Sequence, residues 1–265
     1  MGINLLLVGA GKMGGALLQR MAGEVEAYVV DPAPPSSKLT VLAGVNWLAS
    51  PDKIDPAFAP EIVVFATKPQ YAAQILPAYK RFEASVFLSI MAGTTLAGIA
   101  KLLGGQNFAV VRSMPNLPAS IGQGISVAVP NKNVNSAQRA LCAKLLGAFG
   151  TVVWTGDENH LDAVTALSGS GPAYVFALIE AMAAAGEKLG LPQAMAQQLA
   201  RQTVIGSGAL LAQSKESPEV LRAAVTSPAG TTEAALKQLL AAGGLQDLML
   251  KTMKAAAERA KELAR

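Results

Sequence analysis

The sequence predicts an α/β protein in which a doubly wound parallel sheet precedes an all-α region. Three observations support this fold class. Strand-like and helix-like segments alternate up to about residue 155, a Gly-rich segment joins the first strand to the first helix, and the remaining chain is rich in Ala, Leu and Met. Strand–helix alternation is typical of a parallel sheet with helices on both faces. We therefore expect two domains, residues 1–155 and residues 156–265.

The predicted strands of the first domain are short, unbroken apolar runs. They fall at residues 3–8, 27–30, 61–66, 85–90, 109–112, 125–129 and 151–154. The predicted helices between them lie at residues 11–21, 36–42, 69–79, 94–103 and 136–149. Strands buried on both faces lack the polar alternation of a half-exposed sheet, so these runs favour parallel pairing.

The second domain is predicted to contain helices only. They fall at residues 161–189, 192–213, 217–225, 231–241 and 245–263. Ser217, Pro218 and Glu219 together form a good helix start, with a capping residue, a proline at the first position and an early acid. Residues 173–185 are apolar on more than one face, which is typical of a helix buried on all sides.

The chain carries little charge for its length. Of its 265 residues, 51% are hydrophobic and 15% are charged, whereas soluble chains carry about 25% charged residues. A membrane span needs about 20 consecutive apolar residues, and the best stretch, 173–185, is shorter and contains Glu180. We therefore expect no membrane segment, and a homo-oligomer that covers the apolar surface. No secretory signal is visible, so we expect a cytoplasmic protein.

The residue counts exclude several classes of site. With one Cys (Cys142) and one His (His160), the chain cannot form a disulfide scaffold or a Cys/His metal centre, and we expect no metal. His160 follows polar residues and is most simply interpreted as a solvated loop residue. The net charge of +4 is dispersed along the sequence, which disfavours nucleic-acid binding and suits small anionic ligands.

The Gly-rich segment has the pattern of a dinucleotide-binding fingerprint. It consists of Gly9, Ala10, Gly11, Lys12, Met13 and Gly14. It directly follows a predicted strand and opens a predicted helix, which is the context that the fingerprint requires. Gly9 would permit the tight turn, Gly11 the close approach of a pyrophosphate, and Gly14 close helix–strand packing. The first domain is therefore predicted to be a Rossmann-type NAD(P)-binding domain.

Asp31 ends the second predicted strand, where an acid usually binds the ribose 2′-hydroxyl and favours NAD over NADP. Ser36, Ser37 and Lys38 follow closely and could instead hold a 2′-phosphate. A third interpretation makes Asp31 a turn residue before Pro32. The residues alone leave NADPH and NADH open.

Two further strand ends are expected to line the cofactor crevice, because ligands of open α/β sheets bind at the carboxyl ends of the strands. The residues concerned are Ala66, Thr67, Lys68, Pro69, Met91, Ala92 and Gly93. Ala92 and Gly93 are small enough for close approach of a ribose or nicotinamide. Lys68 is either a charged contact or an ordinary solvated residue.

Two unusual segments interrupt the helical half. Residues 168–172 (Ser-Gly-Ser-Gly-Pro) predict a kink or a new helix start with exposed amides. Residues 226–232 (Thr-Ser-Pro-Ala-Gly-Thr-Thr) offer hydroxyls and backbone amides at a helix N-terminus, which suits a small carboxylate. A capped helix start without a ligand is the simpler alternative for the second segment.

These segments together resemble the pyrroline-5-carboxylate reductase family. The matching blocks run in family order over essentially the whole chain: residues 9–14, 66–70 (Ala-Thr-Lys-Pro-Gln), 114–118 (Met-Pro-Asn-Leu-Pro), 162–174 and 227–232. The resemblance implies an NAD(P)H-binding domain and a helical domain that forms an interlocked homodimer, with assembly into larger rings such as a decamer. It also implies hydride transfer to the C=N bond of 1-pyrroline-5-carboxylate, which gives L-proline.

By the same resemblance, Thr232 would orient the substrate ring nitrogen. Ser227 and the backbone amides of Gly230 and Thr231 would hold its carboxylate. Many family members carry a small polar or basic residue where this chain has Asp31, so the resemblance does not fix the preference between NADPH and NADH.

Two alternatives belong to other classes. β-Hydroxyacid dehydrogenases also join a Rossmann domain to helices, but they carry a catalytic Lys on a helix after a Gly-rich segment, and residues 173–185 contain no Lys. A non-catalytic NAD(P)-sensing module would be expected to lack the hydroxyl-rich segment 227–232, which is intact here.

Overall fold

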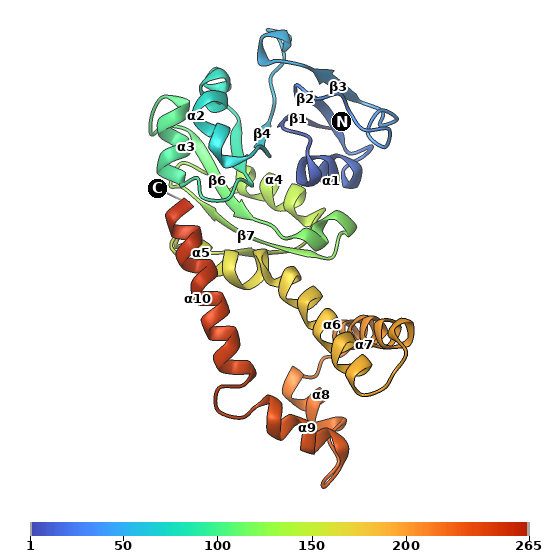
Figure 1. Cartoon of the computed structure of the whole chain (residues 1–265). Coiled ribbons are helices and arrows are strands. Elements are labelled where there is room, and N and C mark those ends of the chain that lie inside the picture. Colours follow the sequence, from blue (N-terminus) through green and yellow to red (C-terminus); the bar gives the residue numbers. More distant parts are fainter. Residues whose placement is uncertain (1, 264–265) are drawn as a thin grey trace. The chain divides into compact units, whose positions relative to one another are not determined.

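The computed structural model describes residues 2–263 (Figure 1). Residue 1 of the first predicted domain and residues 264–265 of the second lie outside the described range. Contacts divide the chain into two compact units, residues 1–170 with the last helical turns from residue 256, and residues 171–255. The domain boundary near residue 155 stays a prediction.

The first unit is built on one eight-stranded sheet. The strands are β1 (Ile3–Val8), β2 (Val25–Val30), β3 (Val45–Leu48), β4 (Ile62–Phe65), β5 (Val86–Ser89), β6 (Ala109–Met114), β7 (Gly124–Pro130) and β8 (Gly150–Trp154). Their order is β3-β2-β1-β4-β5-β6-β7-β8, and all neighbours pair in parallel except β6 and β7. The first six strands therefore have the 3-2-1-4-5-6 order of dinucleotide-binding folds, which confirms the predicted Rossmann-type sheet.

Side-chain alternation along the strands builds a core on each face of the sheet. Leu5 and Leu7 of β1 pack with residues of α1 (Lys12–Arg20) and α4 (Ser136–Gly147). Leu6 and Val8 point to the opposite face and pack with residues of α3 (Leu96–Leu103) and of the segment around Tyr79. Successive side chains of a strand point to opposite faces, so unbroken apolar strands require helices on both sides.

Several local predictions were wrong. Residues 36–42 form turns instead of a helix, and β3 at residues 45–48 was not predicted. The predicted helix 69–79 is divided into a 3₁₀ turn at Pro69–Tyr71, the short α2 (Ala72–Ile75) and a 3₁₀ turn at Leu76–Tyr79. Pro77 explains this break, because it lacks the amide hydrogen that a continuous helix needs. The antiparallel β7 also departs from the fully parallel sheet that was expected.

The remaining helices follow β8, and none of the described residues after it forms a strand. They are α5 (His160–Val164), α6 (Gly171–Lys188), α7 (Gln193–Gln213), α8 (Pro218–Ala224), α9 (Thr231–Leu239) and α10 (Leu245–Leu263). A π-helical turn at Thr165–Gly169 separates α5 from α6, so the predicted interruption near residues 168–172 is present.

The second unit has almost no core of its own. Its main internal contact is between α6 and α7 (Figure 1), and its buried apolar residues are Ala183 on α6 and Ala196 and Ala200 on α7. The large apolar side chains of α6 and α7 are instead exposed in the single chain, as Phe176 (52%) and Leu199 (52%) illustrate. The prediction that residues 173–185 are buried on all sides therefore does not hold within one chain.

Candidate cofactor and substrate site

The predicted cofactor residues gather at one edge of the sheet. β1, β2, β4 and β5 are parallel neighbours, so their carboxyl ends lie side by side. The sheet order reverses between β1 and β4, which is the position where open α/β sheets bind dinucleotides. All the predicted cofactor residues lie in the first unit, at or just after these four strand ends.

The three glycines of the fingerprint have three distinct geometries. Gly9 has φ +92°, and a Cβ there would lie 2.8 Å from Thr67 Cγ2 and 2.9 Å from the Ala66 carbonyl oxygen. A Cβ on Gly14 would overlap the Gly9 carbonyl oxygen. A Cβ on Gly11 would meet nothing within 4 Å. Gly9 and Gly14 are thus required by the protein's own packing, whereas the open side of Gly11 is space that a ligand can approach.

Helix α1 begins at this open space without a side-chain cap. Gly11 is its N-cap residue and makes no side-chain capping hydrogen bond, and the first turn carries no acid. Amides at a helix N-terminus favour negative charge. The turn therefore has the features needed to bind a pyrophosphate.

Both carboxylate oxygens of Asp31 accept a backbone hydrogen bond. Oδ2 accepts the backbone N–H of Ala10 at 2.7 Å, and Oδ1 accepts that of Ala33 at 2.9 Å. Asp31 therefore braces the Gly-rich turn against the segment that follows β2. The neighbouring Ser36, Ser37 and Lys38 are exposed, so this edge of the site presents one carboxylate and one cation to solvent.

The loops after β4 and β5 contact each other. The Thr67 hydroxyl, after β4, donates to Met91 Sδ, after β5, at 3.3 Å. The end of β4 is also joined to the end of β1, because the Ala66 amide donates to the Val8 carbonyl at 2.8 Å. Gly93 has φ +75°, so the loop after β5 turns in a conformation that favours glycine. Lys68 is exposed. The structure thus joins the Gly-rich turn and both further strand ends in one continuous surface.

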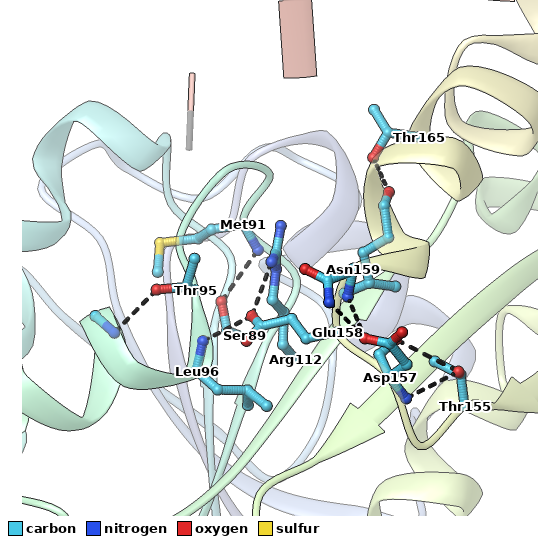
Figure 2. Close-up of polar contacts among 12 residues, drawn as sticks. Ser89, Met91, Thr95, Leu96, Arg112, Thr155, Asp157, Glu158, Asn159 and Thr165 are labelled. Carbon is cyan, nitrogen blue, oxygen red and sulfur yellow. Dashed lines mark hydrogen bonds and ion pairs between the residues drawn. The ribbon is translucent and has the colours of Figure 1, made fainter. Parts of the chain in front are cut away.

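An ion pair between a buried arginine and a half-buried glutamate, next to the β5 loop, was not predicted from the sequence. Arg112 Nη1 lies 2.8 Å from Glu158 Oε1, and the same oxygen accepts the backbone N–H of Leu96 at 2.8 Å (Figure 2). The Arg112 side chain is 7% exposed. The signal was available, because Arg112 follows three apolar residues of the predicted strand 109–112, and ionisable residues in such strands are rarely buried without a partner.

The predicted substrate segment lies in the second unit, before and at the start of α9. Ala229 has φ +57°, and its N–H donates to Glu233 Oε2 at 2.6 Å. The Gly230 N–H donates to the Ser227 carbonyl at 3.0 Å, so this amide is already used within the turn. Gly230 is the N-cap residue of α9 and makes no side-chain capping hydrogen bond. Thr232 is half-buried.

The Ser168–Pro172 segment forms the π-helical turn and the start of α6. The Ser170 amide donates to the Thr165 carbonyl at 2.8 Å, and the Ser168 hydroxyl donates to the Val164 carbonyl at 3.0 Å. A Cβ on Gly169 would lie 2.8 Å from Met114 Cε. The turn is therefore closely packed on the end of β6, and π-helical turns occur frequently at functional sites.

The remaining titratable candidates lie outside this site. The exposed His160 has Nδ1 2.8 Å from the Thr155 hydroxyl, in a local polar turn. Burial raises the pKa of the Cys142 thiol to about 12, which makes it a poor nucleophile. Within residues 2–263, no cluster of three or more His, Cys, Asp or Glu is placed to hold a metal ion. No helix in the same range is long and apolar enough to cross a membrane.

Comparison with known proteins agrees with this geometry. Residues 158–263 match a family model described as pyrroline-5-carboxylate reductase dimerisation. The chain is 39% identical to a pyrroline-5-carboxylate reductase of Pseudomonas aeruginosa, over 98% of this chain and 97% of that protein. It superposes on the solved reductase of Coxiella burnetii with a TM-score of 0.90 and 32% identity over the full length of both chains.

A second solved structure adds the cofactor to the comparison. The pyrroline carboxylate reductase of Plasmodium falciparum, solved with NADP bound, matches with a TM-score of 0.82 and 27% identity over 99% of this chain and 98% of that one. With the nucleotide-binding turn, the strand order and the hydroxyl-rich segment on one chain, and with these full-length matches, the protein belongs to the pyrroline-5-carboxylate reductase family.

Proposed function

We propose that this chain catalyses the NAD(P)H-dependent reduction of 1-pyrroline-5-carboxylate to L-proline, the last step of proline biosynthesis. The observation that carries the proposal is the open side of Gly11 at the uncapped start of α1. Other glycines of the chain are equally open, but Gly11 is the second glycine of the fingerprint, the position at which a pyrophosphate approaches the backbone.

We assign the cofactor to the carboxyl edge of the sheet. The amides at the start of α1 would hold the pyrophosphate, Asp31 would face the adenosine ribose, and residues 66–69 and 91–93 would line the nicotinamide side. The bound NAD(P)H supplies the hydride for the C=N carbon. The residues of this chain contribute position and charge, and holding two reactants in a reactive geometry accounts for much of the rate.

We assign the substrate to the segment before α9. The Ser227 hydroxyl and the Thr231 amide would hold the carboxylate at the positive end of the helix, and the Thr232 hydroxyl would orient the ring nitrogen. Gly230 joins them only if its amide leaves the Ser227 carbonyl, to which it donates here. Glu233 is bonded to the Ala229 amide, which engages its negative charge within the turn.

The proposed working form is a homodimer made through the helical region, with further assembly into a ring such as a decamer, in the cytoplasm. The exposed apolar side chains of α6 and α7 support the dimer.

The test is a spectrophotometric assay of the purified protein with NADPH and, separately, NADH. Absorbance at the nicotinamide band is expected to fall only after 1-pyrroline-5-carboxylate is added, with proline accumulating in equal amount. An absorbance that stays flat with both cofactors would refute the assignment.

A further inference from the structure

We propose that Arg112 and Glu158 form a positioning pair that fixes the loop between β5 and α3 for cofactor binding. The inference rests on the proposed function, because that loop, residues 90–95, carries Met91, Ala92 and Gly93 of the proposed nicotinamide side.

The pair lies directly below the loop. Arg112 on β6 is in register with Ser89 on β5, so both occupy the carboxyl end of the sheet. The Ser89 hydroxyl accepts the Met91 amide at 3.3 Å, and Glu158 accepts the Leu96 amide at 2.8 Å (Figure 2). The first and last turns of the loop are thus each held by a side chain at this edge, and Arg112 holds Glu158 in place.

Stability alone does not account for this arrangement. Burying the Arg112 charge is costly, the Glu158 side chain stays 27% exposed, and an apolar pair of similar size often gives equal or greater stability than a buried ion pair. Glu158 has a geometric task that an apolar residue cannot perform, because one carboxylate oxygen meets both the Arg112 guanidinium and the first amide of α3. The loop so fixed also contacts the neighbouring strand end through Thr67 and Met91, so its position affects two parts of the proposed cofactor surface.

The experiment compares two variants with wild type. Glu158→Gln leaves an acceptor for the Leu96 amide but leaves the Arg112 charge without its partner. The double variant Arg112→Met with Glu158→Leu removes both charges and also removes that acceptor. The measurements are the Kd of NADPH and NADH from nicotinamide fluorescence, Tm, amide exchange of residues 90–96 in the cofactor-free protein, and the kinetic constants.

If the pair positions the loop, Tm and the cofactor Kd should respond differently to the two variants. Glu158→Gln is expected to raise the cofactor Kd and KM about tenfold, the equivalent of one charge-assisted hydrogen bond, with KM for the imino acid unchanged. The double variant is expected to melt at a higher temperature than Glu158→Gln, because no charge is left unpaired, while its cofactor Kd stays raised and its loop amides exchange faster. Recovery of both Tm and Kd in the double variant, or a wild-type Kd in Glu158→Gln, would overturn the inference.

A matched control is available in the exposed ion pair between Glu24 and Lys144, whose charged atoms lie 3.0 Å apart. Glu24→Gln is expected to change neither Kd nor loop exchange, because exposed pairs contribute little. Cofactor binding is measured without substrate, so a wild-type protein that binds NAD(P)H but does not reduce 1-pyrroline-5-carboxylate would refute the proposed function while leaving the Kd comparison valid.

Discussion

Two glycine-to-alanine substitutions in the nucleotide-binding turn should separate an effect on cofactor affinity from an effect on folding stability. Gly11→Ala adds a Cβ where nothing lies within 4 Å, at a residue with φ −63°, which an L-residue adopts without strain. Gly14→Ala adds a Cβ that overlaps the Gly9 carbonyl and lies 3.2 Å from Ala66 Cβ. The first variant should therefore lose ligand contact, and the second should lose packing.

The expected sizes follow from these contacts. If the Gly11 methyl group costs the pyrophosphate one charge-assisted hydrogen bond, about 1.5–3 kcal/mol is lost, and the cofactor Kd rises about 10- to 150-fold. Overpacking against backbone costs about 1–3 kcal/mol, which the better helix propensity of Ala offsets by up to about 1 kcal/mol. With the full offset, Gly14→Ala should still lose up to about 2 kcal/mol, a fall of up to several degrees in Tm.

The assay is a fluorescence titration of the cofactor beside a thermal melt for each variant. Gly147→Ala provides a control, because it lies in α4 with nothing within 4 Å of its added Cβ; it should bind the cofactor normally and melt at or slightly above the wild-type temperature. A Gly11→Ala protein that binds the cofactor as tightly as wild type would refute the assignment of the open space to a ligand.

Three further predictions concern single side chains. Thr232→Val should lower kcat/KM for the imino acid about tenfold through loss of one hydroxyl contact with cofactor Kd unchanged, and unchanged kinetics would remove Thr232 from the mechanism. Asp31→Ser and Asp31→Asn should both raise the ratio of kcat/KM with NADPH to kcat/KM with NADH, because each removes a negative charge. If this ratio changes in neither variant, Asp31 is a turn residue only. Burial raises the Cys142 pKa to about 12 from its ordinary 9.0, so above pH 9 the unfolded state loses a proton that the folded state keeps, and the free energy of unfolding should fall by up to about 1.4 kcal/mol per pH unit for this group. In denaturant titrations between pH 8 and 10, the free energy of unfolding of Cys142→Ala should fall less steeply than that of wild type. An equal slope in the two proteins would contradict the buried thiol.

The central strands and the cofactor turn could be predicted because their local pattern determines their environment. An unbroken apolar strand such as β4 is stable only between two layers, and a glycine fingerprint between a strand and a helix has few other uses. β3 was missed because Asn46 breaks its apolar run and it pairs only with β2 at the edge of the sheet.

Strand direction needed a different kind of information. An unbroken apolar run favours parallel pairing, but it does not fix the direction of an individual strand. The connection from β6 to β7, residues 115–123, contained the signal, because a parallel crossover needs about a dozen residues or more, usually with a helix.

The hydrogen bond of the Gly230 amide could not be predicted, since it depends on the left-handed conformation of Ala229.

The exposed large apolar side chains of the described residues are concentrated in the helical unit. Between residues 171 and 255 the buried apolar side chains are alanines, at positions 183, 196 and 200, while Phe176, Leu199 and many other large side chains are exposed. Alanines bury too little apolar area to offset the entropy lost on ordering these helices. The unit must therefore gain most of its stability from contacts outside itself. We propose that a second copy supplies them, as the dimerisation family model over residues 158–263 supports, and stability that comes from association depends on concentration. The apparent Tm should rise with protein concentration in dilution-series melts, with dissociation visible by light scattering; a monomer of 27.2 kDa with a concentration-independent Tm would contradict the shared core.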